Sequence, residues 1–142
     1  MPAIADPGSS VVRAAHDLGL EVVALTGPMS LMLALASSGL NGQNFAFVGY
    51  LPQDGTERSQ RIRELESLAL RTGQTQIFIE TPYRNTALLQ ALLQTLQGNT
   101  RLALSCGLTL GAAWTKSALV SKWKQDKPTP PLSLPTVFCM GR

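Results

Sequence analysis

The stretch "TQIFIETPYRNTALLQALLQTLQG", residues 75–98, decides the fold that we expect, because it passes from a strand to a helix within a few residues. Its first part, 75–80, is a short apolar run with β-branched and aromatic residues, typical of a central strand. A polar connection, 81–85, follows, and the next segment carries leucines at helical spacing, namely Leu88, Leu89, Leu92, Leu93 and Leu96. This order of strand, connection and amphipathic helix predicts an α/β fold.

The same alternation continues in both directions along the chain. We expect further strands at 21–28, 44–52, 100–106 and 136–140, and further helices at 9–18, 29–40, 56–73 and 117–125. The helix at 29–40 is apolar nearly all round, which predicts that it is buried. Residues 107–116 form either a loop or a weak edge strand, and the late joins rich in Gly and Pro favour an antiparallel edge. The pattern predicts a mixed sheet of about five strands flanked by helices.

Composition places the chain among globular proteins with one real core or two small lobes. The chain has 142 residues, of which 44% are hydrophobic and 15% are charged. No apolar run reaches the eighteen or so residues of a membrane span, and the first residues lack the charged and apolar regions of a signal peptide. We therefore expect a cytoplasmic protein that does not interact with a membrane.

The residues that most often carry chemistry are few. His16 is the single histidine, and its place opposite the apolar stripe of the first helix predicts a solvated side chain. Cys106 and Cys139 lie in apolar runs without a metal-spaced partner, so we expect two buried thiols and no metal. The phosphate-binding glycine motifs of dinucleotide-binding and P-loop proteins are absent from the sequence.

The net charge of +3 is compatible with an RNA or phosphate partner, although the excess is small. Four arginines fall on the helix expected at 56–73, and four lysines cluster late in the chain: Arg58, Arg61, Arg63, Arg71, Lys116, Lys122, Lys124 and Lys127. Such runs are usually solvated faces, and an RNA-binding module built on the arginine helix is the competing interpretation.

Four polar stretches stand at the ends of expected strands, where α/β folds build their sites. They are 6–10, 26–30, 50–52 and 80–85. The first two precede helices, so their backbone N–H groups could receive a carboxylate or a phosphate. Glu80 and Arg84 are four residues apart, which predicts an ion pair that either locks the loop or orients a substrate hydroxyl or phosphate. Taken alone, these features indicate a ligand-binding α/β domain.

An ordered set of motifs goes further. The chain carries Asp6-Pro7-Gly8, the segment 22–30, Gly39-Leu40, the segment 45–52 and the segment 78–84 in that order. Over residues 2 to 105 this series resembles the S-adenosylmethionine-dependent methyltransferases of the tetrapyrrole methylase superfamily. It is most similar to the branch that methylates a ribose 2′-hydroxyl in bacterial small-subunit ribosomal RNA.

The resemblance implies two α/β domains with the cofactor, S-adenosylmethionine, in the cleft between them. By this resemblance 1–27 looks like the end of the N-terminal cofactor domain and 28–142 like the C-terminal domain, so the chain by itself is expected to be inactive. A ribosomal RNA partner and a homodimer are also implied, and no metal is demanded.

The same resemblance implies the cofactor-binding residues. The Asp6, Pro7 and Gly8 loop would approach the methionine part of the cofactor. The wall at the domain boundary would be formed by Gly27, Pro28 and Ser30. The turn with Glu80, Thr81 and Arg84 would lie near the adenosine side of the cofactor. No catalytic residue is implied.

Two alternatives remain open at this point. One is a non-catalytic α/β domain for dimerisation or ligand binding, and the other is a methyltransferase that acts on a tetrapyrrole or another small molecule. Because the strand expected at 22–25 lacks a preceding strand, we also expect residues 1–27 to self-associate, to exchange strands or to lack order.

Overall fold

The computed structural model describes residues 1–126 and 131–142, and within them the chain forms one mixed five-stranded sheet. The strands lie in the order β1-β2-β5-β3-β4. The first two are parallel, and every other neighbouring pair is antiparallel. Their bounds are β1 Phe45–Tyr50, β2 Thr75–Glu80, β3 Arg101–Cys106, β4 Trp114–Leu119 and β5 Thr136–Gly141. The α/β class and the mixed sheet predicted from the sequence are confirmed.

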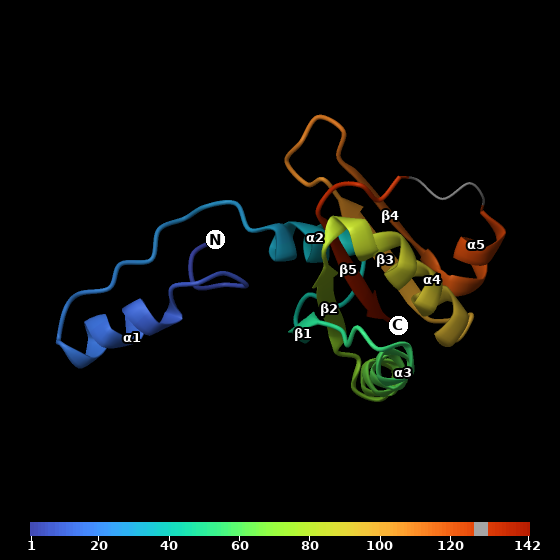
Figure 1. Ribbon diagram of the computed structural model, residues 1–142, viewed down its shortest axis with the longest axis horizontal. Coiled ribbons are helices and arrows are strands. Elements are labelled where there is room, and N and C mark those ends of the chain that lie inside the picture. Colours follow the sequence, from blue (N-terminus) through green and yellow to red (C-terminus); the bar gives the residue numbers. More distant parts are fainter. Residues whose placement is uncertain (127–130) are drawn as a thin grey trace.

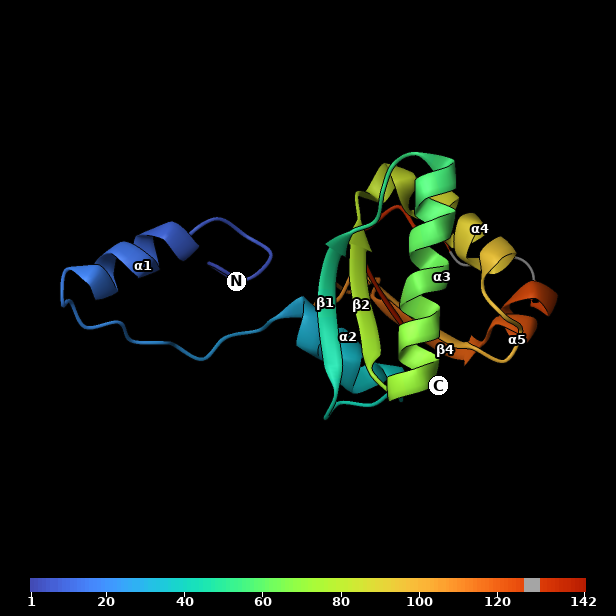
Figure 2. The same cartoon turned by 90° about the horizontal axis from the view of Figure 1, so that it is seen from below.

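Helices cover both faces of this sheet, which gives three layers (Figures 1 and 2). Helix α2 (Ser30–Ser38) lies on one face. The opposite face is covered by α3 (Gly55–Thr72), α4 (Asn85–Thr95) and α5 (Val120–Gln125). A short 3-10 helix, η1 (Pro82–Arg84), joins β2 to α4.

Side chains on the two faces of the strands contribute to two separate hydrophobic cores. Phe78 and Phe138 face α3 and α4, and their rings stack with centroids 5.7 Å apart. Their neighbours Ile77 and Val137 point to the other face and pack with Leu31 of α2. Successive side chains of a pleated strand alternate between its two faces, so each buried strand contributes side chains to both cores.

Helix α2 is buried on one side only, in contrast to the prediction that it would be buried all round. Leu31, Ala34 and Leu35 lie against the sheet, whereas Leu33 is 39% exposed. The reason is that α2 is the one helix on its face in the part of the chain that the structure describes, so no second helix covers its outer side.

The strand predicted near the start of the chain is not formed. We call residues 1–27 the N-terminal arm; both views show it extending away from the sheet (Figures 1 and 2). Helix α1 (Ser9–Asp17) is present as predicted, but Val23 and Leu25, in the expected strand, are 65% and 83% exposed. A strand needs a neighbour for its N–H and C=O groups, and none of the described strands pairs with this segment.

The boundary between β4 and α5 also differs from the prediction. Residues 117–119 were expected to be helical but extend β4, because β3 pairs with it from Arg101 and Leu119 to Cys106 and Trp114. Pairing along a whole edge overrides the local helical pattern. The helix then begins at Val120, and the indole of Trp123 donates to the carbonyl of Leu102 at 2.8 Å. Lys127, one of the clustered lysines, lies outside the described residues.

Helix α3 shows a cap that was not predicted. The helix begins at Gly55, and the Asp54 carboxylate accepts hydrogen bonds from the N–H groups of Thr56 at 2.9 Å and Glu57 at 3.0 Å. These two bonds, the one from Glu57 first, lower the pKa of Asp54. At its other end the helix stops at Gly73, whose φ of 71° is left-handed.

We expect the contribution of the Asp54 cap to depend on pH. The pKa of Asp54 is lower in the folded protein than in the unfolded protein, where it is about 3.9. The carboxylate therefore contributes its full stabilisation above a pH of about 3.9, and this contribution is lost as the pH falls through the folded-state pKa. Asp54→Asn keeps a capping oxygen without the charge. Urea unfolding of both proteins between neutral and strongly acidic pH should show the wild-type advantage shrinking on acidification, and a pH-independent difference would contradict the prediction.

Candidate functional site

A pocket with a volume of about 460 Å³ opens at the edge of the sheet where β1, β2 and β3 end and β5 begins. Each strand contributes one polar side chain to its wall, namely Tyr50, Glu80, Ser105 and Thr136. Ser30, the first residue of α2, completes this set. Ligand sites of open α/β sheets occur at such an edge, beyond the carboxyl ends of parallel strands.

Glu80 is the most constrained charged group of the pocket. Its Oε1 accepts hydrogen bonds from the N–H of Thr81 at 2.7 Å and the Thr81 hydroxyl at 3.2 Å. Arg84 donates to the same oxygen from Nε at 3.1 Å and forms an ion pair with it through its terminal nitrogen at 3.0 Å. The ion pair predicted from the sequence is therefore present. All these contacts fall on Oε1, so among the described residues Oε2 remains available to a ligand donor.

The residue after this turn ties the pocket floor to helix α4. Asn85 is fully buried, and its Nδ2 donates to the carbonyls of Leu132 at 3.1 Å and Leu134 at 3.0 Å. The same nitrogen donates to the Thr136 hydroxyl at 3.1 Å. Three buried acceptors thus depend on one amide group, which fixes the segment leading into β5.

The N-terminus of α2 supplies the opposite polarity. Met29 stands at the N-cap position and offers no side-chain hydrogen bond, so the first N–H groups of the helix are left without a capping partner. Free N–H groups at a helix start carry partial positive charge. The pocket therefore combines hydrogen-bond donors near Ser30 with a carboxylate acceptor at Glu80.

Several residues of the pocket were not predicted from the sequence, namely Ser105, Gly107, Leu108, Leu110 and Thr136. Gly107 is the informative one, because its φ is +64° and an added Cβ would lie 2.7 Å from Leu134 Cδ1. A glycine directly after a buried strand was the available signal. The pairing of β5 with both β2 and β3 brings these residues beside Glu80.

The sequence-predicted cofactor residues fall into three places. Ser30, Glu80 and Thr81 line the pocket, and Arg84 forms an ion pair with Glu80. Gly27 and Pro28 line a separate apolar groove beside α2, and the Asp6-Pro7-Gly8 loop lies in the N-terminal arm (Figure 1). The roles assigned to these residues stay predictions.

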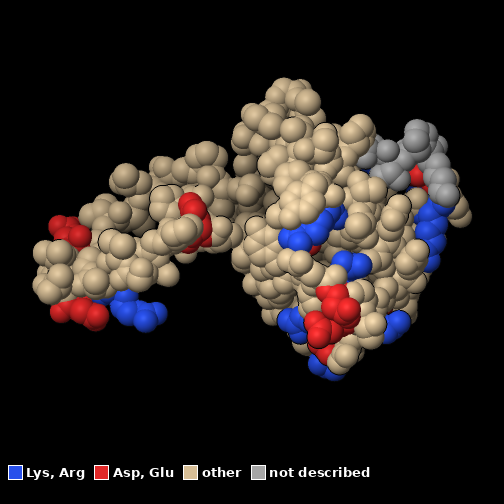
Figure 3. Space-filling view, viewed as in Figure 1, with Lys and Arg blue, Asp and Glu red and all other residues tan. Residues whose placement is uncertain are grey.

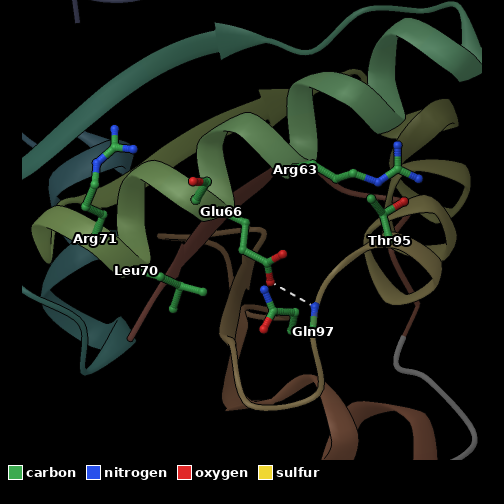
Figure 4. Close-up of a pocket in the computed structure, with 7 residues that line it drawn as sticks. Arg63, Glu66, Leu70, Arg71, Thr95 and Gln97 are labelled. Carbon is green, nitrogen blue, oxygen red and sulfur yellow. Dashed lines mark hydrogen bonds between the residues drawn. The ribbon is translucent and has the colours of Figure 1, made fainter.

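A second hollow lies between α3 and the loop after α4 (Figure 4). The buried Glu66 carboxylate at its floor links α3 to the loop after α4, because it accepts hydrogen bonds from the N–H of Gln97 and the hydroxyl of Thr100. Arg63 and Arg71 stand at its two ends and point away from each other. Because the polar floor is already paired and the cations diverge, this hollow is a weaker candidate for a ligand site.

The charges on the visible face do not form one basic surface. Blue and red patches alternate over the body of the molecule (Figure 3). Several cations are paired with carboxylates, as in Arg61 with Glu64 at 3.2 Å and Lys116 and Lys122 with Asp126 at 3.1 Å each. Charge alone therefore does not identify an RNA-binding face here.

The cysteines behave as predicted. Cys106 and Cys139 are free and buried in β3 and β5, and burial raises the pKa of the Cys139 thiol to about 12. In residues 1–126 and 131–142 no cluster of three or more His, Cys, Asp and Glu side chains could hold a metal ion. No described helix combines the length and apolar character that a membrane crossing requires.

Solved structures define the class of fold. The chain superposes on the methyltransferase CobJ with a TM-score of 0.61 and 17% identity, covering 99% of this chain and 61% of that one. It also superposes on the cobalt precorrin-4 methyltransferase CbiF with a TM-score of 0.55 and 10% identity, over 93% of this chain and 56% of that one. The α/β fold is that of the tetrapyrrole methylases.

Curated relatives narrow this class. The chain is 35% identical over 108 residues to ribosomal RNA small subunit methyltransferase I of Vibrio cholerae, which is 76% of this chain and 36% of that protein. The protein of the same name from Halalkalibacterium halodurans is 36% identical over 109 residues, again 36% of its length. Homologues of this chain therefore include proteins named as small-subunit ribosomal RNA methyltransferases, as the sequence motifs indicated. The chain spans about 36% of their length, and no protein-family model matches it.

We expect Arg84→Ala to destabilise the protein by about 1–3 kcal/mol, because it leaves a nearly buried carboxylate without its cation. The side chain of Glu80 is 5% exposed in this pair. Arg61→Ala is the matched control, because the Arg61–Glu64 pair is 44% and 50% exposed, and its loss should cost about 0.5 kcal/mol or less. Free energies of unfolding in urea give the comparison, and equal losses for the two variants would refute the expectation.

Proposed function

We propose that the chain is the C-terminal part of an S-adenosylmethionine-dependent methyltransferase that acts on a ribose 2′-hydroxyl of small-subunit ribosomal RNA. The observation that carries this proposal is the 35% identity over 108 residues to proteins named for that ribosomal RNA. A tetrapyrrole acceptor has weaker support, since the likeness to CobJ and CbiF is one of fold. An RNA acceptor of this kind places the protein in the cytoplasm, which cell fractionation would check.

The pocket at the carboxyl edge suits part of such a cofactor. Its volume of about 460 Å³ lies in the range of small-molecule sites. Ile79, Leu108 and Val137 provide apolar wall for a planar base, and Oε2 of Glu80 is an acceptor for a ribose hydroxyl. When bound, the cofactor supplies the methyl group, and the residues of this chain bind and orient it.

The domain division predicted from the sequence is part of the proposal. We assign 28–142 to the C-terminal α/β domain and 1–27 to the end of the N-terminal cofactor domain. The N-terminal arm supports this assignment, because none of its residues is buried while the body has two cores. The Asp6-Pro7-Gly8 loop would then reach the methionine part of the cofactor only when both domains are present.

The cofactor proposal predicts weak but localised binding by this chain. Titration with S-adenosylhomocysteine, followed by NMR, should shift the backbone amides of Thr81, Gly107 and Thr136, because these residues border the pocket. With half of the cleft contributing, the dissociation constant should be roughly millimolar, which corresponds to about −4 kcal/mol.

The amide of Ser67 in the second hollow serves as internal control and should not shift. Glu80→Gln should weaken the binding, since the ligand loses a charged acceptor. Chemical-shift changes confined to amides outside the pocket would refute the placement of the cofactor. A micromolar dissociation constant would refute the need for a second domain.

We also propose that copies of this chain associate through the N-terminal arm, which would bring two chains into a homodimer. Val11 in α1 and Leu18 at its C-cap are 72% and 75% exposed, and covering an apolar side chain of this size is worth about 1.5–3 kcal/mol. Val11→Lys and Leu18→Lys together should therefore raise the dissociation constant of the dimer about tenfold or more.

Sedimentation velocity over a range of concentrations measures this effect against the monomer mass of 15.2 kDa. His16→Lys adds a similar charge to another exposed position of the same helix and should leave association unchanged. A wild-type chain that stays monomeric at every concentration would overturn the proposal.

A further inference from the structure

Both tyrosines of the chain stand at the edge of the sheet that carries the pocket, and both are exposed. The chain has two tyrosines in all. Tyr50 ends β1 and is 59% exposed, and Tyr83 lies in η1 after β2 and is 80% exposed. Of the other aromatic rings, Phe78, Phe138 and Trp123 are 0–1% exposed, Phe47 and Trp114 are half-buried, and Phe45, at the opposite end of β1, is 39% exposed. Two exposed rings at the ends of neighbouring parallel strands need an explanation other than core packing.

Tyr50 is held by the strand that carries it. The register of β1 against β2 shifts between Phe47 and Tyr50, and Gly49 in this irregularity has a φ of +74°. Bulges of this kind turn a side chain in a new direction and are frequent beside functional sites. Leu51, the next residue, is 4% exposed and anchors the end of the strand in the core. The Tyr50 ring therefore borders the pocket from a fixed backbone.

Tyr83 contacts the arginine of the Glu80–Arg84 ion pair. The guanidinium of Arg84 lies 5.2 Å from the centre of the Tyr83 ring, and the same guanidinium is paired with Glu80 at 3.0 Å. A cation over one face of the ring attracts it electrostatically, which favours this orientation of the ring. Because the residue is 80% exposed, most of the remaining ring surface is open to a ligand. Pro82, the preceding residue, lines the pocket, whereas Tyr83 is not among the lining residues.

We propose that Tyr50 and Tyr83 are stacking platforms that receive unpaired bases of the RNA acceptor at the mouth of the pocket. This inference rests on the proposed function, which supplies RNA as the acceptor. Proteins that recognise single-stranded RNA splay its bases onto aromatic rings and arginine planes. Such stacking needs an exposed, rigidly held ring and reads no hydrogen-bond pattern, so it tolerates many sequences. Tyr50, Tyr83 and the neighbouring Arg84 provide these surfaces.

The position of the Tyr83 ring favours RNA over the cofactor and over a protein partner. The Tyr83 ring stands outside the pocket proposed for the cofactor, whose apolar wall is made by Ile79, Leu108 and Val137. The fully buried core of a protein interface is its most apolar part, and polar residues form its rim. The chain neighbours of Tyr83 are Thr81, Pro82 and Arg84, of which only Pro82 is apolar.

The test compares Tyr50→Ala and Tyr83→Ala with Tyr50→Phe and Tyr83→Phe in the full chain. Fluorescence anisotropy with a labelled, mixed-sequence single-stranded RNA at low salt gives the dissociation constants. We expect each alanine variant to bind roughly tenfold more weakly and each phenylalanine variant to bind like the wild type, because phenylalanine keeps the ring. The dependence of the constant on salt should be unchanged, since no phosphate contact is removed.

Each result has a distinct meaning. If the alanine variants bind RNA as the wild type does, the stacking proposal fails while the proposed function stands. If they bind RNA normally and lose the NMR shifts caused by S-adenosylhomocysteine, the rings serve the cofactor and the proposal is likewise overturned. If the wild-type chain binds no RNA, both the stacking proposal and the proposal of an RNA acceptor fail. The titration with S-adenosylhomocysteine still tests the assignment as a methyltransferase. Urea unfolding of all four variants excludes loss of fold as the cause of any effect.

Discussion

The last strand of the chain, β5, lies between β2 and β3 and pairs antiparallel with both, and the rest of the sheet depends on this insertion. All six residues of β5 are buried. It joins a parallel pair, β1 and β2, to an antiparallel pair, β3 and β4, which share no other hydrogen-bonded strand. Phe138 stacks on Phe78 for one core, and Val137 and Cys139 serve the other. Removing β5 would therefore divide both the sheet and its two cores.

The same insertion builds the pocket. Thr136, the first residue of β5, sits opposite Glu80 on one side and Cys106 on the other, so the ends of β2 and β3 meet only through it. Asn85 holds the approach to β5 with three hydrogen bonds, and Glu80 is locked by Thr81 and Arg84 one turn earlier. Most of the polar groups buried at this edge are paired with one another, which lowers the cost of burying them, although the Asn85 Oδ1 has no hydrogen-bond partner among the described residues. The bonds that hold the fold also shape the candidate site.

The sequence predicted the parts of this structure that depend on local pattern. The strand at 75–80, the helix after it and the Glu80–Arg84 pair need only residues a few positions apart, and each was expected. The strand predicted at 21–28 is not formed, because a strand needs a neighbour and none of the described strands pairs with this segment. Gly107 and Ser105 were missed as pocket residues because their place beside Glu80 follows from strand order, which is non-local information.

Exposed hydrophobic surface has two different causes in this molecule. Val11, Leu18 and Leu25 are aliphatic, and their exposure on the N-terminal arm has no compensating contact, so the arm gains stability whenever something covers it. Tyr50 and Tyr83 combine a ring with a hydroxyl that water can solvate, and rigid backbone holds both at the mouth of the pocket. Their exposure therefore costs the folded chain less. Such rings can stay exposed on a folded body and be presented to a ligand, whereas the aliphatic side chains of the arm gain free energy only when another surface covers them.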